Sequence, residues 1–428
     1  MPAHNSPVHA DADINKLETR SAPELVTSHV GALYALAAGT FAVGTEGFMI
    51  AAILPEVAHA LSVGVPAAGQ LVTVFTLIYA ISSPLLTAFT AVHSRRALLM
   101  GSLAAFVLAN LLAAAAHSYW SLMGARILLA LAAGLYVPNA NALAGTLVHP
   151  SRRGRALAIV NGGITVAVAL GVPAGAFVGA HLGWRLTFVG VAVLAAAALL
   201  VLTVRLPRNM QGSAPASVRE RLAIIAYPGA LGTLATTTLW ATGAYAVYTY
   251  VSPFISVSTG LPAEHAGMMI TVVGVSAIFG VTLGGIANDH WGARRAQAIA
   301  LPLLAMAFAG LTVAGLMMAP AAMVPVLALM VVWGLSAWGF YPPQQDRLIA
   351  VVGVGHAPVA LSLNASFMYL GFALGAALGS LVIALTSVLW IGLAGALCII
   401  AAALISQATW AASASRTRVQ HVAGGPGH

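Results

Sequence analysis

Charged side chains are scarce in this sequence. Only 7% of the 428 residues are Asp, Glu, Lys or Arg, and 60% are hydrophobic, whereas an average soluble domain has about 25% charged residues. The single cysteine, Cys398, excludes a disulfide framework and a cysteine-based metal site. We therefore expect an all-α polytopic membrane protein that needs no cofactor and binds no metal.

Several motifs of other protein classes are also missing. The sequence has no Gly-Lys-Ser/Thr nucleotide loop, which argues against ATP-driven transport, and no His-Glu-x-x-His or Gly-x-Ser-x-Gly, which argues against an enzyme. The net charge of +8 comes from short basic clusters between apolar runs, so we expect no nucleic-acid partner. Residues 1–29 carry four acidic residues and no apolar core, so we expect a polar tail rather than a signal peptide.

Twelve apolar segments predict twelve transmembrane helices, because about 20 apolar residues span a bilayer. Their approximate ranges are 30–54, 67–91, 97–117, 120–147, 155–180, 184–204, 223–251, 265–288, 296–319, 321–345, 357–385 and 387–410. An even number places both termini on one side. With that side cytoplasmic, every Lys and Arg except Arg126 and Arg185 falls inside, as the positive-inside rule requires.

The segments divide into two related sets of six. Matching stretches recur about half a chain apart: Ala68-Gly69 and Ala266-Gly267, Arg95-Arg96-Ala97 and Arg294-Arg295-Ala296, and Ala169-Leu170-Gly171 and Ala373-Leu374-Gly375. Such a repeat is typical of transporters. We expect pseudo-symmetric halves at 30–204 and 223–410, a cytoplasmic linker at 205–222, and cytoplasmic tails at 1–29 and 411–428.

Two ionisable residues lie at membrane depth. A charge there costs roughly 3 kcal/mol or more, so Glu46, within Gly44-Thr45-Glu46-Gly47-Phe48-Met49-Ile50, is a proton-binding or substrate-binding acid, or a structural carboxylate bonded between helices. Arg126 is expected about 9 Å and Glu46 about 12 Å below the same outer face at 1.5 Å per residue. Buried acids and bases pair, so the two should meet. The alternative for Arg126 is snorkelling to the headgroups.

Five stretches carry a family resemblance. Gly285-x-x-x-Asp289-x-x-Gly292-x-Arg294-Arg295 resembles the cytoplasmic loop signature of the major facilitator superfamily, although Thr90 replaces the acid in the first-half copy. Gly171-Val-Pro173-Ala-Gly175 resembles the helix 5 motif of its antiporters. Gly183-Trp184-Arg185-Leu-Thr-Phe188, the Glu46 stretch and Leu361-Ser-Leu-Asn364-Ala-Ser366 resemble a branch of bacterial drug:proton antiporters and sugar or nucleoside efflux permeases, including chloramphenicol exporters.

The resemblance implies the major facilitator fold and roles for single residues. Arg126 matches the helix 4 arginine of the family. Gly171, Pro173 and Gly175 would lie between the halves, where Pro173 should also kink the helix. Asp289 would dock near Arg155 and lock the inner side in the outward-open state. Asp346, beside Arg347, is interpreted as structural rather than as a second proton site.

The substrate cavity is expected near the midplane between the halves. Residues that could line it as polar anchors or aromatic walls are Asn139, Asn141, Asn161, Thr238, Thr242, Tyr245, Trp338, Tyr341 and Asn364. Each of them could equally serve helix packing, where Thr and Asn bond to neighbouring helices.

These observations favour a secondary transporter of the bacterial cytoplasmic membrane, monomeric, whose partners are a small partly apolar substrate and protons. A carboxylate that alternates between apolar surroundings and a guanidinium can load and release a proton, so export would be coupled to proton entry. The alternatives are a permease for a sugar, nucleoside or amino acid in which Glu46 binds only substrate, and a non-transporting sensor of the same fold.

Overall fold

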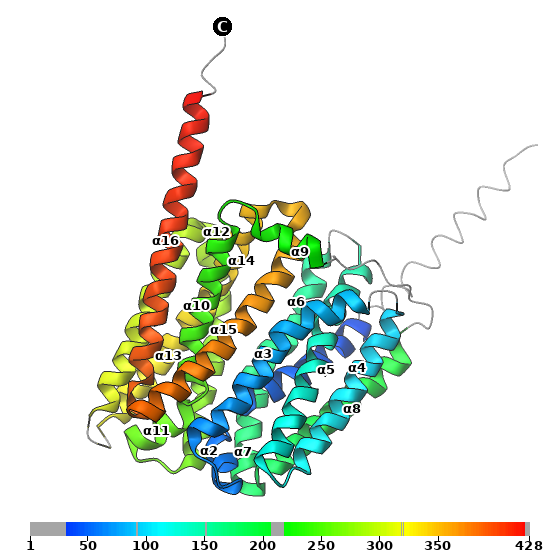
Figure 1. Cartoon of the computed structure of the whole chain (residues 1–428), viewed down its shortest axis with the longest axis vertical. Coiled ribbons are helices and arrows are strands. Elements are labelled where there is room, and N and C mark those ends of the chain that lie inside the picture. Colours follow the sequence, from blue (N-terminus) through cyan, green and yellow to red (C-terminus); the bar gives the residue numbers. More distant parts are fainter. Residues whose placement is uncertain are drawn as a thin grey trace, which may run out of the picture.

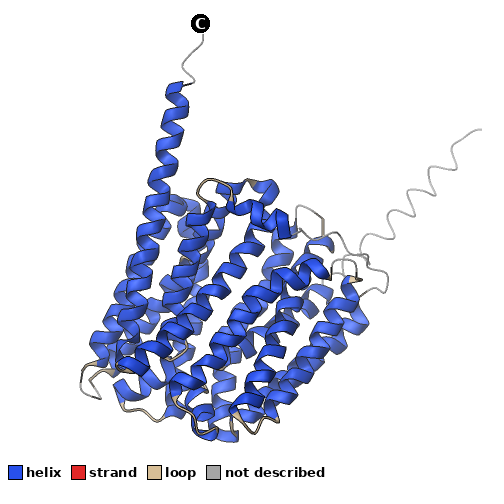
Figure 2. Ribbon diagram, viewed as in Figure 1, coloured by secondary structure: helices blue, strands red, loops and turns tan. Residues whose placement is uncertain are grey.

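The computed structural model describes residues 31–90, 93–149, 152–206, 218–317, 319 and 321–423. Within these ranges every regular element is a helix and no strand occurs (Figure 2), which confirms the all-α prediction. The tail 1–29, residues 207–217 of the predicted linker and residues 424–428 of the C-terminal tail lie outside the described residues.

The first predicted half begins with a bent pair of helices. The first helix (Gly31–Met49) turns by 64° into the short α2 (Leu54–Ala60), where Pro55 occupies the first turn and cannot donate a backbone hydrogen bond. The helices that follow are α3 (Val65–Phe89), α4 (Arg95–Ala114), α5 (Tyr119–Thr146), α6 (Arg153–Val166), α7 (Val172–Leu182) and α8 (Trp184–Arg205).

A π-helix, η2 (Ala167–Gly171), joins α6 to α7. The N–H of Val172 bonds to the carbonyl of Ala167, five residues back, and Pro173 follows in the first turn of α7. Single π turns of this kind absorb local irregularities inside long helices. The kink expected at Pro173 stays a prediction, and the irregularity that the structure shows is the π turn just before this residue.

The second predicted half contains α9 (Val218–Ile225), α10 (Ala230–Tyr248), α11 (Val251–Thr259), α12 (Ala263–Gly315), α13 (Met323–Gly339), α14 (Tyr341–Val352), α15 (Ala357–Leu385) and α16 (Ile391–Ala423). The long α12 covers two predicted segments and is broken at Gly292, whose φ of 76° favours glycine.

Nine helices of the described ranges are long and apolar enough to cross a membrane, or ten when the bent pair counts as one span. In this count of helices, α12 contributes a single span although it holds two predicted segments. The number twelve therefore stays a prediction.

The two predicted halves pack along α3 and α15, which lie side by side (Figure 1), and where α12 meets α7 and η2. Three hydrogen bonds between described residues cross this boundary. Gln70 donates to Ser380 at 3.0 Å, Ser380 donates to the Pro66 carbonyl at 3.0 Å, and Tyr248 donates to the Phe48 carbonyl at 3.1 Å. Pro66 and Ser380 lie near the end that carries α2 and α11, at the bottom of Figure 1, so the bundle is closed there.

Two rows of glycines bring neighbouring helices into close contact. Gly171 and Gly175 face Thr45 and Met49 of the first helix, whereas Gly375 faces the backbone of α10 at Thr242. The resemblance implied that the helix 5 glycines lie between the halves. The structure instead turns them toward the first helix, in the same predicted half.

Part of the boundary with the second half lies one turn earlier on the chain. There Val168 and Ala169 of η2 approach Gly274 of α12, where a β-carbon would lie 2.6 Å from the Val168 carbonyl oxygen. This contact comes from residues of the π turn. The glycines, which recur four residues apart and therefore share one face of the helix, pack against the first helix instead.

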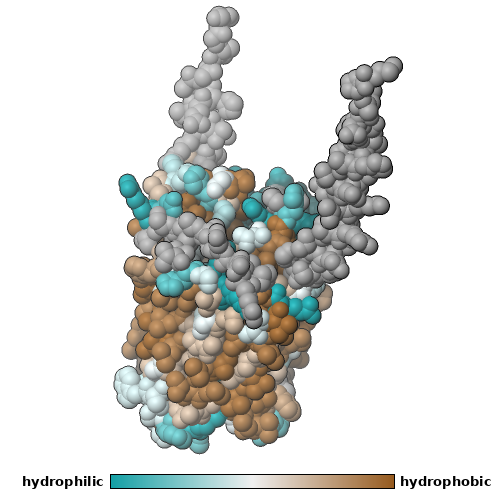
Figure 3. All heavy atoms as spheres, turned by 90° about the vertical axis from the view of Figure 1, so that its right-hand side faces the viewer, coloured by the Kyte–Doolittle hydropathy of each residue, from teal (hydrophilic) through white to brown (hydrophobic). Residues whose placement is uncertain are grey.

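The outer surface of the bundle is apolar over a broad band. Figure 3 shows hydrophobic residues between two ends where hydrophilic residues gather. Exposed residues of α4 and α8, among them Leu108, Val193 and Leu200, belong to this surface. An apolar exterior of this kind fits a lipid environment, in which only satisfied backbone such as helix can be exposed.

Candidate functional site

Glu46 and Arg126 form a buried ion pair in the first half of the molecule. Nη1 of Arg126 donates to Oε1 of Glu46, and both side chains are fully inaccessible to solvent. Nε of Arg126 also donates to the Leu71 carbonyl at 3.2 Å, and the guanidinium lies 4.2 Å from the centre of the Phe75 ring. The predicted meeting of Glu46 and Arg126 is confirmed.

The pair retains unused hydrogen-bonding capacity. Oε2 of Glu46 and Nη2 of Arg126 have no hydrogen-bond partner among the described residues, and neither has the hydroxyl of neighbouring Thr45. Buried polar atoms are nearly always bonded, and a buried pair stabilises a fold only weakly against its desolvation cost. These atoms are therefore candidates for contacts with a ligand or a proton.

Aromatic rings from both predicted halves gather beside this pair. We call the group formed by Phe48, Tyr79, Tyr245, Tyr248, Tyr369 and Phe372 the central aromatic cluster; all six side chains are at least partly buried. Tyr79 of α3 stacks on Tyr369 of α15 with 3.7 Å between ring centres. Tyr245 of α10 stacks on Phe372 at 3.8 Å.

The central aromatic cluster is continuous with the ion pair. Phe48 comes two residues after Glu46, and its ring lies 6.1 Å from Tyr245 and 5.8 Å from Tyr248. On the other side of the pair, Phe75 contacts Arg126 and its ring centre lies 6.5 Å from that of Tyr79. The acid, the base and the rings thus form one buried site between the first helix, α3, α5, α10 and α15.

The other predicted cavity residues lie in several environments. Tyr245 belongs to the central aromatic cluster. Thr238 and Thr242 donate to backbone carbonyls of their own helix, and Thr238 also donates to the Phe367 carbonyl of α15 at 3.2 Å. Asn364 accepts a 2.7 Å hydrogen bond from Thr237. Tyr341 stacks near Trp240 at 5.9 Å, and Trp338 packs partly buried against the core.

Three of the predicted asparagines are far from the ion pair. Asn141 donates to Asn161 at 3.2 Å in an exposed contact between α5 and α6. Asn141 comes 15 residues after Arg126, or about 22 Å along the helix. Asn139 donates to the Leu135 carbonyl at 2.7 Å. A substrate-binding role for these residues stays a prediction.

The loop signature lies at the opposite end from the closed contact. Asp289, Arg294 and Arg295 are exposed around the break at Gly292, and Gly285 has open space beside it. No ion pair joins Asp289 to Arg155 among the described residues. Since the expected lock belongs to the outward-open state, and this bundle is closed at the other end, the role of Asp289 stays a prediction.

A second buried polar group surrounds Arg347. Its Nη2 donates to Thr409 at 2.7 Å and its guanidinium lies 3.7 Å from the Trp410 ring centre. Gln297 donates to Gln344 at 2.9 Å beside it. Asp346 is exposed. These contacts give Arg347 a structural role, whereas the structural interpretation of Asp346 stays a prediction.

The sequence analysis missed most of the central aromatic cluster. Only Tyr245 was singled out among its six members. Their helices are apolar on every face, so no periodic pattern distinguishes rings that point inward from rings that face lipid. A tyrosine within a membrane segment, such as Tyr79 or Tyr369, is the one available signal, because its hydroxyl needs a partner when buried.

Comparisons with known proteins identify the class to which this site and fold belong. Residues 36–376 match the Major Facilitator Superfamily, so the chain belongs to this superfamily. It is 32% identical over 391 residues to the MFS-type transporter YbcL of Bacillus subtilis, covering 88% of this chain and 96% of that protein. It is 33% identical over 352 residues to the inner membrane transport protein YdhP of Escherichia coli, covering 82% and 88%.

Two further similarities are to a curated resistance protein and to a solved structure. The chain is 32% identical over 281 residues to the chloramphenicol resistance protein of Streptomyces lividans, covering 64% of this chain and 71% of that protein. A bacterial homologue of the human lysosomal transporter Spinster, solved in an inward-facing and occupied conformation, matches with a TM-score of 0.72 at 16% identity, covering 88% of this chain and 96% of that one.

These findings confirm the predicted major facilitator fold and superfamily. The protein is a multi-pass membrane transporter rather than an enzyme, and it moves a small molecule across a lipid bilayer.

Proposed function

We propose that this transporter is a proton-coupled exporter of a small, partly apolar compound, with Glu46 and Arg126 as its proton-coupling pair. The observation that carries this proposal is the fully buried Glu46–Arg126 ion pair beside the central aromatic cluster. Keeping a charge at membrane depth costs roughly 3 kcal/mol, which favours a working role over a purely structural one.

The pair supports coupling because Glu46 is ionised when it contacts Arg126 and protonated when the two are apart. While Arg126 contacts Glu46, the guanidinium favours the charged carboxylate. When helix movement or substrate separates them, an ionised Glu46 would stay in apolar surroundings without a partner, so it takes up a proton. With Glu46 neutral, the transporter passes through the closed state more easily. Renewed contact with Arg126 then releases the proton on the other side of the membrane.

The central aromatic cluster supports the assignment of substrate class. Flat ring pairs such as Tyr79–Tyr369 and Tyr245–Phe372 can exchange their mutual contact for contact with a bound ring. Apolar walls with a few polar groups fit small organic ligands. The similarity to a chloramphenicol resistance protein supports amphipathic antibacterial compounds as the first candidates.

The arrangement in the membrane is part of the same proposal. We place both termini in the cytoplasm of a bacterium and the protein in its inner membrane, as a monomer. Supporting observations are the basic clusters on one side of the predicted spans and the similarity to an inner membrane transport protein.

The test uses purified protein in proteoliposomes with an imposed pH gradient. Radiolabelled chloramphenicol, then a panel of nucleosides, sugars and cationic dyes, is offered to vesicles with an acidic lumen. We expect accumulation of at least one amphipathic compound, its collapse on adding a protonophore, and no accumulation with Glu46→Gln. Asp346→Asn, which changes an exposed acid, is the matched control and should accumulate normally. Flux that ignores the gradient in folded protein would reassign the protein as a facilitator.

A further inference from the structure

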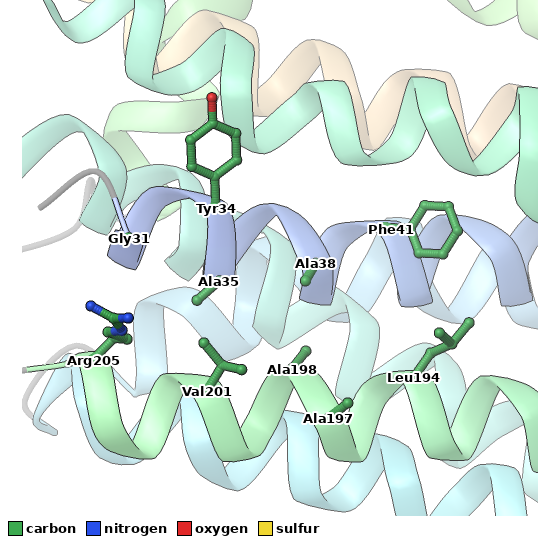
Figure 4. Close-up of a pocket in the computed structure, with 10 residues that line it drawn as sticks. All are labelled: Gly31, Tyr34, Ala35, Ala38, Phe41, Leu194, Ala197, Ala198, Val201 and Arg205. Carbon is green, nitrogen blue, oxygen red and sulfur yellow. The ribbon is translucent and has the colours of Figure 1, made fainter.

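A lateral groove of about 400 Å³ separates the first helix from α8. Figure 4 shows Ala35 and Ala38 of the first helix directed toward Ala198 and Val201 of α8, with Arg205 at one end. The volume lies within the range of ligand sites, roughly 300–1,000 Å³. The groove exists because small side chains face each other along both helices.

The length of the lateral groove matches one leaflet of a bilayer. Its lining on the first helix runs from Gly31 to Phe41, which is about 15 Å at 1.5 Å per residue. Half of a hydrocarbon core of about 30 Å is the same length. The groove opens on the apolar surface, because Ala38 and Val201 are exposed.

The end of the lateral groove carries the positive charge of Arg205. Arg205 is exposed in the last turn of α8 and forms no ion pair with an acidic residue among the described residues. Two carbonyls at this end of α8 already accept from another arginine, since Arg96 donates to Thr203 and Leu206 at 2.9 and 2.8 Å. Arg205 is thus not needed to complete the helix end.

We propose that the lateral groove binds one anionic phospholipid of the leaflet on the side of Arg205. The phosphate contacts the Arg205 guanidinium, and one acyl chain lies along Ala35, Ala38, Ala198 and Val201. A cation at headgroup level followed by an apolar channel one leaflet deep is complementary to this class of molecule in charge and in length. The lipid also packs against the helix that carries Glu46, five residues beyond Phe41.

The headgroup contact is tested by native mass spectrometry of the full chain, titrated with phosphatidylglycerol or with phosphatidylcholine. We expect one phosphatidylglycerol molecule to bind more tightly than phosphatidylcholine. Arg205→Gln should weaken the binding of phosphatidylglycerol about fivefold, which is the effect of one arginine near an anionic surface. Arg219→Gln removes another exposed arginine outside the groove and should leave this binding unchanged.

The acyl-chain contact is tested by filling the groove. Ala38→Leu should abolish the tight binding event, and Ala105→Leu, on the exposed face of α4, should not. Both positions are exposed, so neither variant disturbs the core. Equal binding of the two lipids, or an Ala38→Leu variant that binds like the wild type, would overturn the proposal. If the wild type formed a dimer and Ala38→Leu did not, the groove would be occupied by a second copy of the chain instead of a lipid.

Discussion

Arg126 is fixed by three different groups, and each of them uses a different property of the guanidinium. Its charge pairs with Glu46, its Nε donates to the Leu71 carbonyl, and its plane lies over Phe75. A lysine keeps the charge but cannot form the other two contacts at once. We predict that Arg126→Lys retains part of the transport activity and that Arg126→Ala retains none, as measured by substrate accumulation in proteoliposomes.

The burial of Arg126 also leads to a prediction about stability. Removing one partner of a buried pair costs up to about 3–5 kcal/mol while the remaining group stays charged, so the cost is largest at a pH at which Glu46 remains ionised. In thermal unfolding in detergent, Arg126→Ala should therefore be less stable than the double variant Glu46→Gln/Arg126→Ala, which leaves no buried charge. Normal transport and normal stability of Arg126→Ala would mean that the arginine only extends to the headgroups.

The ion pair was predictable from the sequence and the rings around it were not. Glu46 and Arg126 stand out because so few charges occur at membrane depth, and counting residues from the outer face places them at similar levels. Phe48 and Phe372 are ordinary members of apolar helices. Which way such a ring points depends on helix rotation, which is set by packing between helices and not by local sequence.

Glycine packing gives a prediction at the level of helix pairs. A β-carbon on Gly375 would meet backbone atoms of α10, including the Ala246 nitrogen at 2.9 Å. On Gly175 it would meet Cβ and Sδ of Met49 at 3.1 and 3.2 Å, which is tight but less close than the contact of Gly375 with the Thr242 carbonyl oxygen. We predict that Gly375→Ala destabilises the protein by about 1–3 kcal/mol, as overpacking does, and more than Gly175→Ala does, measured by thermal unfolding.

Gly162 supplies the matched control for this comparison. A β-carbon there has open space within α6, and alanine is a better helix former than glycine by up to about 1 kcal/mol. Gly162→Ala should therefore be neutral or stabilising. If Gly375→Ala were as stable as Gly162→Ala, then α10 and α15 would not be in the close contact described above.

Helix positions followed from hydrophobic length, but helix irregularities did not. The predicted segment 120–147 corresponds to α5 almost residue for residue. By contrast, the predicted segments 265–288 and 296–319 belong to one helix interrupted only at Gly292, and the irregularity near Pro173 takes the form of a π turn. Hydropathy records which residues lie in lipid, whereas these breaks depend on contacts with other helices.

The transport cycle requires the end near Asp289 to close when the other end opens. Asp289 is exposed in the present state, so its lock would form only in the alternate one. We predict that Asp289→Asn lowers the turnover number and leaves the apparent substrate affinity unchanged, as read from a kcat and KM analysis of accumulation rates. Asp346→Asn, another exposed acid, should change neither value. A change of affinity alone would assign Asp289 to substrate binding.

Ser380 connects the predicted halves at the closed end of the molecule. Its hydroxyl accepts from Gln70 and donates to the Pro66 carbonyl, both at 3.0 Å. Each hydrogen bond contributes about 0.5–1.5 kcal/mol, so losing both should raise the population of the state open at this end about tenfold. We predict that Ser380→Ala shifts the distance distribution between spin labels at Ala60 and Val257, which are exposed on α2 and α11, toward longer values.

The matched control is Ser258→Ala, because the Ser258 hydroxyl bonds within its own helix, to the Ile255 carbonyl at 3.3 Å. It should leave the distribution between the labels unchanged. The shift with Ser380→Ala must also reverse when a ligand that binds only the present state is added, since a ligand moves such an equilibrium by its differential affinity. Identical distributions in Ser380→Ala and in the wild type would mean that ring stacking and helix packing, rather than these hydrogen bonds, keep this end closed.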